Sequence, residues 1–179
     1  DLMNATITDR TKLFLLCSPH NPTGRVFNKA ELARMAEISL RRGLVICSDE
    51  IHADLVYPEH PHTPLASLAP EMAARSITLM APSKTFNVPG LGFSFAVIEN
   101  KELRRQYKAA AADIVPHVGL MGYTAALAAY TECDAWLAEC IAYLRGNRDF
   151  LAQFVAERLP GVTMALPEGT YLARLDFRG

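Results

Sequence analysis

The chain has 179 residues, half of them hydrophobic and 21% charged, which is enough apolar material for the core of one domain or of a large part of one. Its 18 basic and 19 acidic residues leave a net charge of −1, and this balance gives no electrostatic argument for a nucleic-acid or membrane-surface partner. No apolar run approaches the roughly 20 residues that a membrane-spanning helix needs. The four cysteines form no C-x-x-C pair and no zinc-spaced cluster with histidine, so we expect reduced thiols in a cytoplasmic protein.

Three short apolar runs predict buried strands, at residues 12–17, 44–47 and 76–80. Runs that are apolar almost throughout are typical of strands with both faces covered, as in a parallel sheet. Between the first two strands, residues 28–42 place apolar side chains at helical spacing. Asn28 can cap this helix with Glu31, three residues later, as its capping-box partner, and Gly43 is expected to end it.

The rest of the chain adds further helices and strands. We expect a short helix near residues 66–74 after a loop rich in proline and histidine, then a strand over 92–98, helices over 101–112, 115–129 and 134–158, and two strands over 162–166 and 171–177. The alternation of strands with helices predicts an α/β fold with a largely parallel sheet. Because the last helix and the two strands form a pattern of their own, we expect a large domain over residues 1–133 and the start of a smaller one over residues 134–179.

Polar residues follow three of the predicted strands. The first strand leads to Asn21, the second ends at Asp49 and the third leads to Lys84. Ligands of open α/β sheets bind beyond the carboxyl ends of the strands, so these side chains meet at one edge if the strands are parallel neighbours. An amide, a carboxylate and an amine together suit a flat ring that has a carbonyl group. Pyridoxal 5′-phosphate (PLP) has these features, since proteins hold it with a lysine Schiff base and a carboxylate at its ring nitrogen.

Each of these residues also has an ordinary structural interpretation. Lys84 can be a solvated loop charge, Asn21 a turn residue between two prolines, and Asp49 an N-cap. Other polar side chains are expected to be surface groups, namely loop histidines that bind no metal and solvated arginines on the long helix. These residues are His20, His52, His60, His62, His117, Arg145 and Arg148.

Three short motifs follow one another along the chain: Ser-Pro-His-Asn-Pro-Thr-Gly at 18–24, Ser-Asp-Glu-Ile-His at 48–52 and Ser-Lys-Thr-Phe-Asn at 83–87. Together they resemble the signature motifs of fold-type-I PLP enzymes, the aspartate-aminotransferase superfamily, although each alone is a weak signal. The flanks of the second and third motifs, and Pro-Glu-Gly-Thr-Tyr-Leu at 167–172, are similar to those of the MalY/PatB-type cystathionine β-lyases, which are C–S lyases. The resemblance extends over nearly the whole chain.

The resemblance implies a three-layer α/β/α large domain and a role for each motif residue. Lys84 would hold PLP as a Schiff base and then act as general base at the substrate α-carbon, while Asp49 would keep the ring nitrogen protonated. Asn21 would hydrogen-bond the 3-oxygen of the ring together with His52, which stands where typical aminotransferases have a tyrosine. Ser83 would contact the phosphate. The implied reaction is β-elimination from cystathionine or cysteine-type amino acids to a thiol, pyruvate and ammonia, in a homodimer.

Two departures favour the lyase branch over an ordinary aminotransferase. Many superfamily members have a serine three residues before the lysine and an arginine eight residues after it, and here these positions are Ala81 and Gly92. The phosphate is therefore expected to be held by residues outside this chain, which resembles the central part of a longer enzyme. By itself such a part is expected to bind PLP poorly, to self-associate and to lack activity.

Two rival functions stay open. One is a class I/II aminotransferase, in which Lys84 returns the proton to a carbon of the cofactor. The other is a regulatory domain that uses the same pocket as a ligand sensor, as in aminotransferase-like transcription regulators. Pyruvate formed from L-cystathionine without a keto-acid acceptor would separate the lyase from the aminotransferase, and a helix-turn-helix in flanking sequence would favour the regulator.

Overall fold

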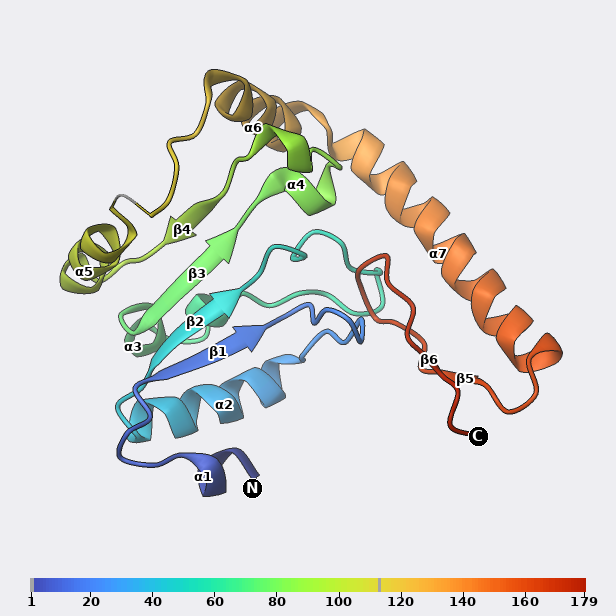
Figure 1. The fold of residues 1–179 in the computed structure, drawn as a ribbon, viewed down its shortest axis with the longest axis horizontal. Helices are drawn as coiled ribbons and strands as arrows, with labels where there is room; N and C mark the ends of the chain where they lie inside the picture. Colours follow the sequence, from blue (N-terminus) through green and yellow to red (C-terminus); the bar gives the residue numbers. More distant parts are fainter. Residues whose placement is uncertain (1, 113) are drawn as a thin grey trace.

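The computed structural model describes residues 2–112 and 114–179, and Figure 1 shows a sheet near the centre with helices around it. The main sheet contains the strands β1 (Leu13–Cys17), β2 (Val45–Asp49), β3 (Ser76–Met80) and β4 (Phe95–Val97), hydrogen-bonded in that order. A second sheet pairs β5 (Thr163–Met164) with β6 (Leu175–Asp176). The helices are α1 (Leu2–Thr6), α2 (Lys29–Arg41), α3 (Pro70–Ala73), α4 (Pro82–Thr85), α5 (Lys101–Ala111), α6 (Leu120–Glu132) and α7 (Asp134–Arg158), with 3₁₀ turns at Leu65–Ser67 and Pro89–Leu91.

The main sheet is mixed, and its first three strands are parallel. β1 pairs with β2 and β2 with β3 in parallel, whereas β4 runs antiparallel to β3. The prediction of an α/β fold with a largely parallel sheet is confirmed. In this register Cys17 lies beside Asp49, and Asp49 lies beside Leu79. The carboxyl ends of the three parallel strands therefore form one edge of the sheet (Figure 1).

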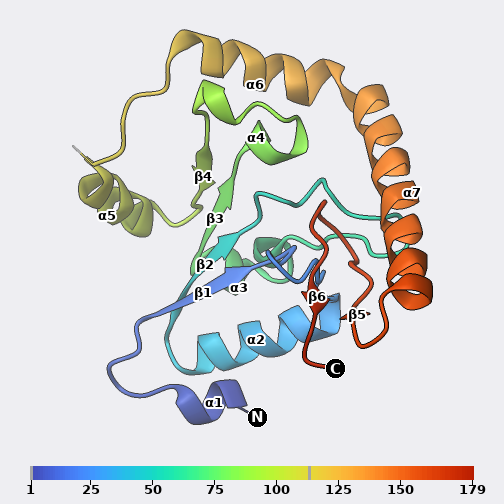
Figure 2. The ribbon, with the colours of Figure 1, turned by 45° about the vertical axis from the view of Figure 1, so that its right-hand side comes forward.

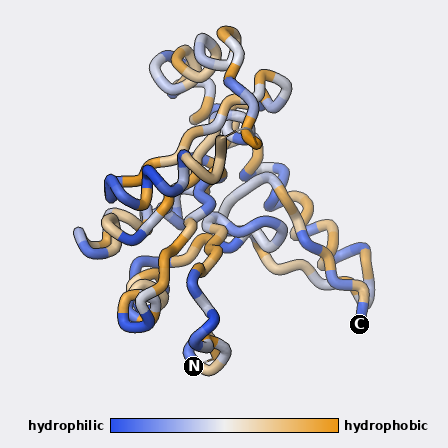
Figure 3. The backbone as a smooth tube through the Cα atoms, turned by 60° about the vertical axis from the view of Figure 1, so that its left-hand side comes forward, coloured by the Kyte–Doolittle hydropathy of each residue, from blue (hydrophilic) through white to orange (hydrophobic). Residues whose placement is uncertain are grey.

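One face of the sheet packs on the main buried core. This core joins side chains of β1, β2, α2, α3 and the first 3₁₀ turn, namely Leu16, Leu32, Ala36, Ile46, Leu65 and Met72. Side chains alternate between the two faces of a strand, and on the opposite face Leu15 is 71% exposed. Figure 3 shows hydrophobic segments running through the strands while the outer helices alternate in character. In the described chain, β1 thus buries one face and leaves an apolar face open.

Local chemistry fixes both ends of α2. The side chain of Asn28 accepts hydrogen bonds from the amides of Ala30 and Glu31, and the carboxylate of Glu31 accepts one from the amide of Asn28. This reciprocal arrangement satisfies amides that have no partner in the first turn of a helix. Gly43 follows with φ +68°, a left-handed conformation that favours glycine, and leads the chain into β2. The predicted capping box and helix end are confirmed.

The C-terminal segment returns from the far end of α7 to the main sheet. Figures 1 and 2 show residues after β5 lying beside the ends of β1 and β2. The amides of Glu168 and Gly169 donate to the carbonyl of Gly24, and the amide of Thr170 donates to the carbonyl of Leu55. These bonds to distant segments take the place of a hairpin ladder. The strands predicted over 162–166 and 171–177 are therefore reduced to two residues each.

The remaining differences concern boundaries. The helix expected near 66–74 is a 3₁₀ turn followed by α3, and the helix expected over 115–129 begins at Leu120. The strand expected over 92–98 keeps only three residues. Lys84, expected in a turn, lies in the short helix α4, where Pro82 occupies the first position and loses no helical hydrogen bond. Among the described residues, no helix combines the length and the apolar character needed to cross a membrane.

Candidate active site

Asp49 is held at the end of β2 by both neighbouring strands. Its carbonyl accepts a hydrogen bond from the amide of Ser18 at 3.0 Å, and the next amide, that of Glu50, donates to the carbonyl of Leu79 at 3.0 Å. Within the described chain, the carboxylate of Asp49 accepts one hydrogen bond, from the amide of Ile51, 3.2 Å from Oδ1. The other carboxylate oxygen therefore remains available to a ligand.

Lys84 follows β3 at the same edge of the sheet. It lies in the last turn of α4 and is half-buried. Its amine makes no hydrogen bond or ion pair with any residue that the structure describes. The preceding residue, Ser83, lines a pocket together with Asp49. A half-buried amine without a counter-ion is suited to covalent chemistry with a carbonyl group.

His52 lies within electrostatic reach of both Asp49 and Lys84. It is only 4% exposed, so the expectation of a solvated loop histidine is wrong. Burial lowers the pKa of His52 below its usual value, while the Asp49 carboxylate raises this pKa and the Lys84 ammonium lowers it. Nδ1 of the ring is buried without a hydrogen-bond partner in the described part of the chain. A buried nitrogen of this kind calls for a hydrogen-bonding ligand.

Asn21 follows β1 in a tight turn. The turn is closed by hydrogen bonds between the amide of His20 and the carbonyl of Arg25 and between the amide of Gly24 and the carbonyl of His20. Asn21 is exposed, and its side chain has no hydrogen-bond partner among residues 2–112 and 114–179. Burial raises the pKa of the Cys17 thiol, the backbone of Asn21 lowers it and Asp49 raises it. Cys17 therefore lies close to both the backbone of Asn21 and the carboxylate of Asp49.

A pocket of about 650 Å³ opens beside Asp49. Asp49 and Ser83 give it polar groups, and most of its other lining is apolar, including Leu79, Met80, Phe93, Phe95, Val115 and Val118. Asn21, His52 and Lys84 do not line this pocket. Of the predicted site residues, the pocket is therefore lined by Asp49 and Ser83.

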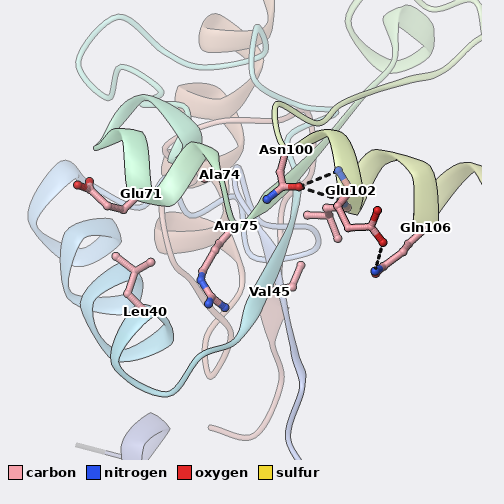
Figure 4. Close-up of a pocket in the computed structure, with 9 residues that line it drawn as sticks. Leu40, Val45, Glu71, Ala74, Arg75, Asn100, Glu102 and Gln106 are labelled. Atoms are coloured by element: carbon pink, nitrogen blue, oxygen red, sulfur yellow. Dashed lines mark hydrogen bonds between the residues drawn. The ribbon is translucent and has the colours of Figure 1, made fainter.

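A second hollow, of about 640 Å³, lies at the opposite end of the sheet between α2, α3 and α5. Figure 4 shows hydrogen bonds among the polar groups on its α5 side, since Asn100 caps α5 and Glu102 accepts from Gln106. Arg75 donates to the carbonyl of Gly43 at 3.0 Å. We assign no site to this hollow because these polar groups already have partners.

Besides His52, two side chains that were expected at the surface are buried. The imidazole of His62 is 8% exposed, and its Nε2 lies 2.8 Å from Oε2 of Glu50. The guanidinium of Arg148 lies over the ring of Tyr57, 4.2 Å from its centroid, and bonds to Glu59 at 3.1 Å. Both partners come from distant segments, which local patterns do not reveal. Within the described residues, no three metal-ligating side chains come together.

The C-terminal turn adds contacts that sequence reasoning missed. The ring of Tyr171 packs edge-on against His52, with 6.0 Å between the ring centroids. Glu168 accepts a hydrogen bond from the amide of Val26 at 2.7 Å and pairs with Arg25 at 3.1 Å. The segment therefore both holds the turn that contains Asn21 and covers His52. The turn residues at 167–170 were a visible signal, but they do not indicate what the turn touches.

The groups at this edge fit PLP. In the described chain the amine of Lys84, one carboxylate oxygen of Asp49 and Nδ1 of His52 all lack a partner. These groups match the aldehyde, the ring nitrogen and the 3-oxygen of PLP. No lysine, arginine or histidine lines the pocket beside Ser83, so the described residues there provide no counter-charge for a phosphate.

Comparison with known proteins establishes the family. The chain matches the family described as Aminotransferase class I and II over residues 1–179, and it belongs to this family. Cystathionine β-lyase PatB of Bacillus subtilis is 41% identical over 170 residues, which cover 92% of this chain and 43% of PatB. The resemblance seen in the motifs is thus confirmed.

Solved structures give the same result. OvoB superposes with a TM-score of 0.90 and 48% identity, over 95% of this chain and 45% of its own. Cystalysin of Treponema denticola, whose structure contains PLP, has a TM-score of 0.89 and 40% identity, over 93% of this chain and 43% of its own. The chain therefore spans less than half the length of the relatives it matches.

Proposed function

We propose that the protein containing this chain is a PLP-dependent C–S β-lyase that acts on cystathionine or cysteine-type amino acids. The observation that carries the proposal is the half-buried Lys84 amine, unpaired in the described chain, at the same sheet edge as Asp49 and His52. PatB, a cystathionine β-lyase, supports lyase chemistry. The reaction balances as cystathionine and water giving homocysteine, pyruvate and ammonia.

Each residue at the edge has a distinct task in this proposal. Lys84 would hold PLP covalently and, once free, would take the proton from the α-carbon of the substrate. When bound, PLP supplies an electron sink for the pair that this proton leaves behind. Asp49 would keep the ring nitrogen protonated through its free carboxylate oxygen. Asn21 and His52 would bond the 3-oxygen, and Ser83 would contact the phosphate.

The wider setting is also a proposal. We infer a homodimer, a small amino-acid substrate and no nucleic-acid partner, the last supported by the balanced charge. We also propose that the chain divides into a large domain over residues 1–133 and a smaller one from residue 134. The break between α6 and α7 supports this division. A cytoplasmic location is supported by the four cysteines, all of which are free thiols in the described chain.

An aminotransferase is the second candidate, because the family includes that activity in its name. Both reactions begin with removal of the α-proton by the same lysine. They differ in the next step. In an aminotransferase the lysine would return the proton to a carbon of the cofactor, and a keto acid would accept the amino group. Ala81 and Gly92, which replace the serine and arginine of many aminotransferases, favour the lyase.

The experiment uses the complete protein loaded with PLP and given L-cystathionine without a keto acid. We expect pyruvate, and we expect Lys84→Ala to remove the visible absorption band of lysine-bound PLP and to lower turnover about 100-fold or more. Lys101→Ala, at the exposed start of α5, should change neither. An unchanged band in Lys84→Ala would overturn the site, and amino transfer without pyruvate formation would favour the second candidate.

A further inference from the structure

A buried polar network lies directly behind Asp49. Glu50 is only 2% exposed. Its Oε1 accepts hydrogen bonds from the hydroxyl of Ser48 at 2.8 Å and from the amide of Leu65 at 3.1 Å. Its Oε2 lies 2.8 Å from Nε2 of His62. The proposed reaction gives none of these four residues a task.

Burying a carboxylate costs free energy unless its oxygens accept hydrogen bonds. The hydrogen bonds to Glu50 are therefore needed to keep it in the core. A carboxylate accepts hydrogen bonds and cannot donate them, so His62 donates from Nε2. Nδ1 of His62 is buried without a partner in the described part of the chain. The bond to Glu50 is therefore the one hydrogen bond of this imidazole among the described residues. It ties the proline-rich loop at 58–64 to the end of β2.

The geometry connects this network to Asp49. Side chains of consecutive residues in a strand point to opposite faces, so Ser48 and Glu50 face the core while Asp49 faces the other way. The backbone of Glu50 is also fixed, because its amide donates to the carbonyl of Leu79 and its carbonyl accepts from the amide of Ala53. Holding Glu50 on the core side consequently sets the direction in which the Asp49 carboxylate points.

We propose that Glu50 and His62 are positioning residues that orient Asp49 toward the ring nitrogen of PLP. The inference rests on the proposed function, because it requires PLP beside Asp49. A carboxylate favours a protonated ring nitrogen most strongly at hydrogen-bond distance, and this effect weakens as the two groups move apart. A small rotation at the end of β2 is therefore enough to break this contact while the fold is retained.

The test follows the protonation of the ring nitrogen in the complete protein reconstituted with PLP that is ¹⁵N-labelled at that atom. His62→Ala removes the donor to Glu50. We expect the ¹⁵N signal to move toward the unprotonated position and the Kd for PLP to rise about tenfold or more, as for other groups that orient a ligand-binding side chain. His62→Gln keeps an N–H donor on a flexible side chain and should stay near the wild-type signal.

Met72→Ala is the matched control for lost packing. Met72 is fully buried in the same core, so its truncation should lower Tm while the ¹⁵N signal stays protonated. If His62→Ala does not fold, Glu50→Gln is measured instead, since it keeps the volume but turns one acceptor into a donor facing His62, and we expect the same direction of change. A signal like that of wild type in the folded variant overturns the positioning role alone. A wild-type protein without a Lys84-dependent PLP band overturns the proposed function and this inference together.

Discussion

At the residue scale, the burial of His52 makes the stability of the folded chain depend on pH. Burial holds the pKa of His52 below its usual value, so the unfolded chain binds the proton more readily than the folded one. The folded state therefore loses stability as the pH falls from the unfolded value of about 6.5 toward the folded pKa. We expect the free energy of unfolding, measured with urea at pH 7 and pH 5, to fall more in wild type than in His52→Gln. Equal losses would show that His52 titrates alike in both states.

The guanidinium of Arg148 is buried, and it keeps its charge because of the carboxylates beside it. Burial alone would lower the pKa of Arg148, but the carboxylates of Asp149 and Glu59 raise it overall, so the guanidinium over the Tyr57 ring stays charged. Arg148→Ala removes the stacking and both ion pairs, and we expect a loss of about 2 kcal/mol in the free energy of unfolding. Arg145→Ala, in the same helix but half exposed, should change it by less than about 0.5 kcal/mol. Similar losses in both variants would argue against the stacked arrangement.

At the scale of elements, prediction succeeded where the signal is local. The capping box at Asn28 lies within one short segment, and the bounds of α2 and α7 agree with the helices predicted over 28–42 and 134–158. Prediction failed where a partner comes from far along the chain. The bond from His62 to Glu50 and the contact between Tyr171 and His52 join segments that no periodicity relates. Most of the sheet edge could therefore be predicted, but not the residues that support or cover it.

Gly24 tests how firmly the C-terminal turn is docked. A Cβ atom at Gly24 would lie within 2.4 Å of Cβ of Pro167, whereas one at Gly43 meets nothing within 4 Å, although both glycines have φ +68°. Gly43→Ala should therefore cost only the backbone strain, about 1–2 kcal/mol. Gly24→Ala should cost more, because it also pushes the turn away from the Asn21 loop. Urea unfolding of both variants measures the difference, and equal costs would mean that the turn is not tightly packed there.

At the scale of the whole molecule, the apolar surface decides how the 179-residue chain behaves by itself. Large apolar side chains are exposed on β1 and α6, including Leu15 at 71% and Leu127 at 68%. Burying such a side chain stabilises an association by about 1.5–3 kcal/mol, and contiguous exposed apolar patches mark interaction surfaces.

Self-association of the isolated chain is the prediction that follows. Sedimentation velocity over a concentration series should show oligomers, and Leu15→Lys and Leu127→Lys should each shift them toward the monomer by removing apolar area and adding like charge. Thr124→Lys on the exposed side of α6 adds the same charge without removing a large apolar group, so it should shift the distribution less. Because the described residues beside Ser83 provide no counter-charge for a phosphate, the same chain should bind PLP weakly in an absorbance titration. A monodisperse monomer that binds PLP tightly would contradict both expectations, since it would show that these surfaces need no cover and that the phosphate is held within residues 1–179.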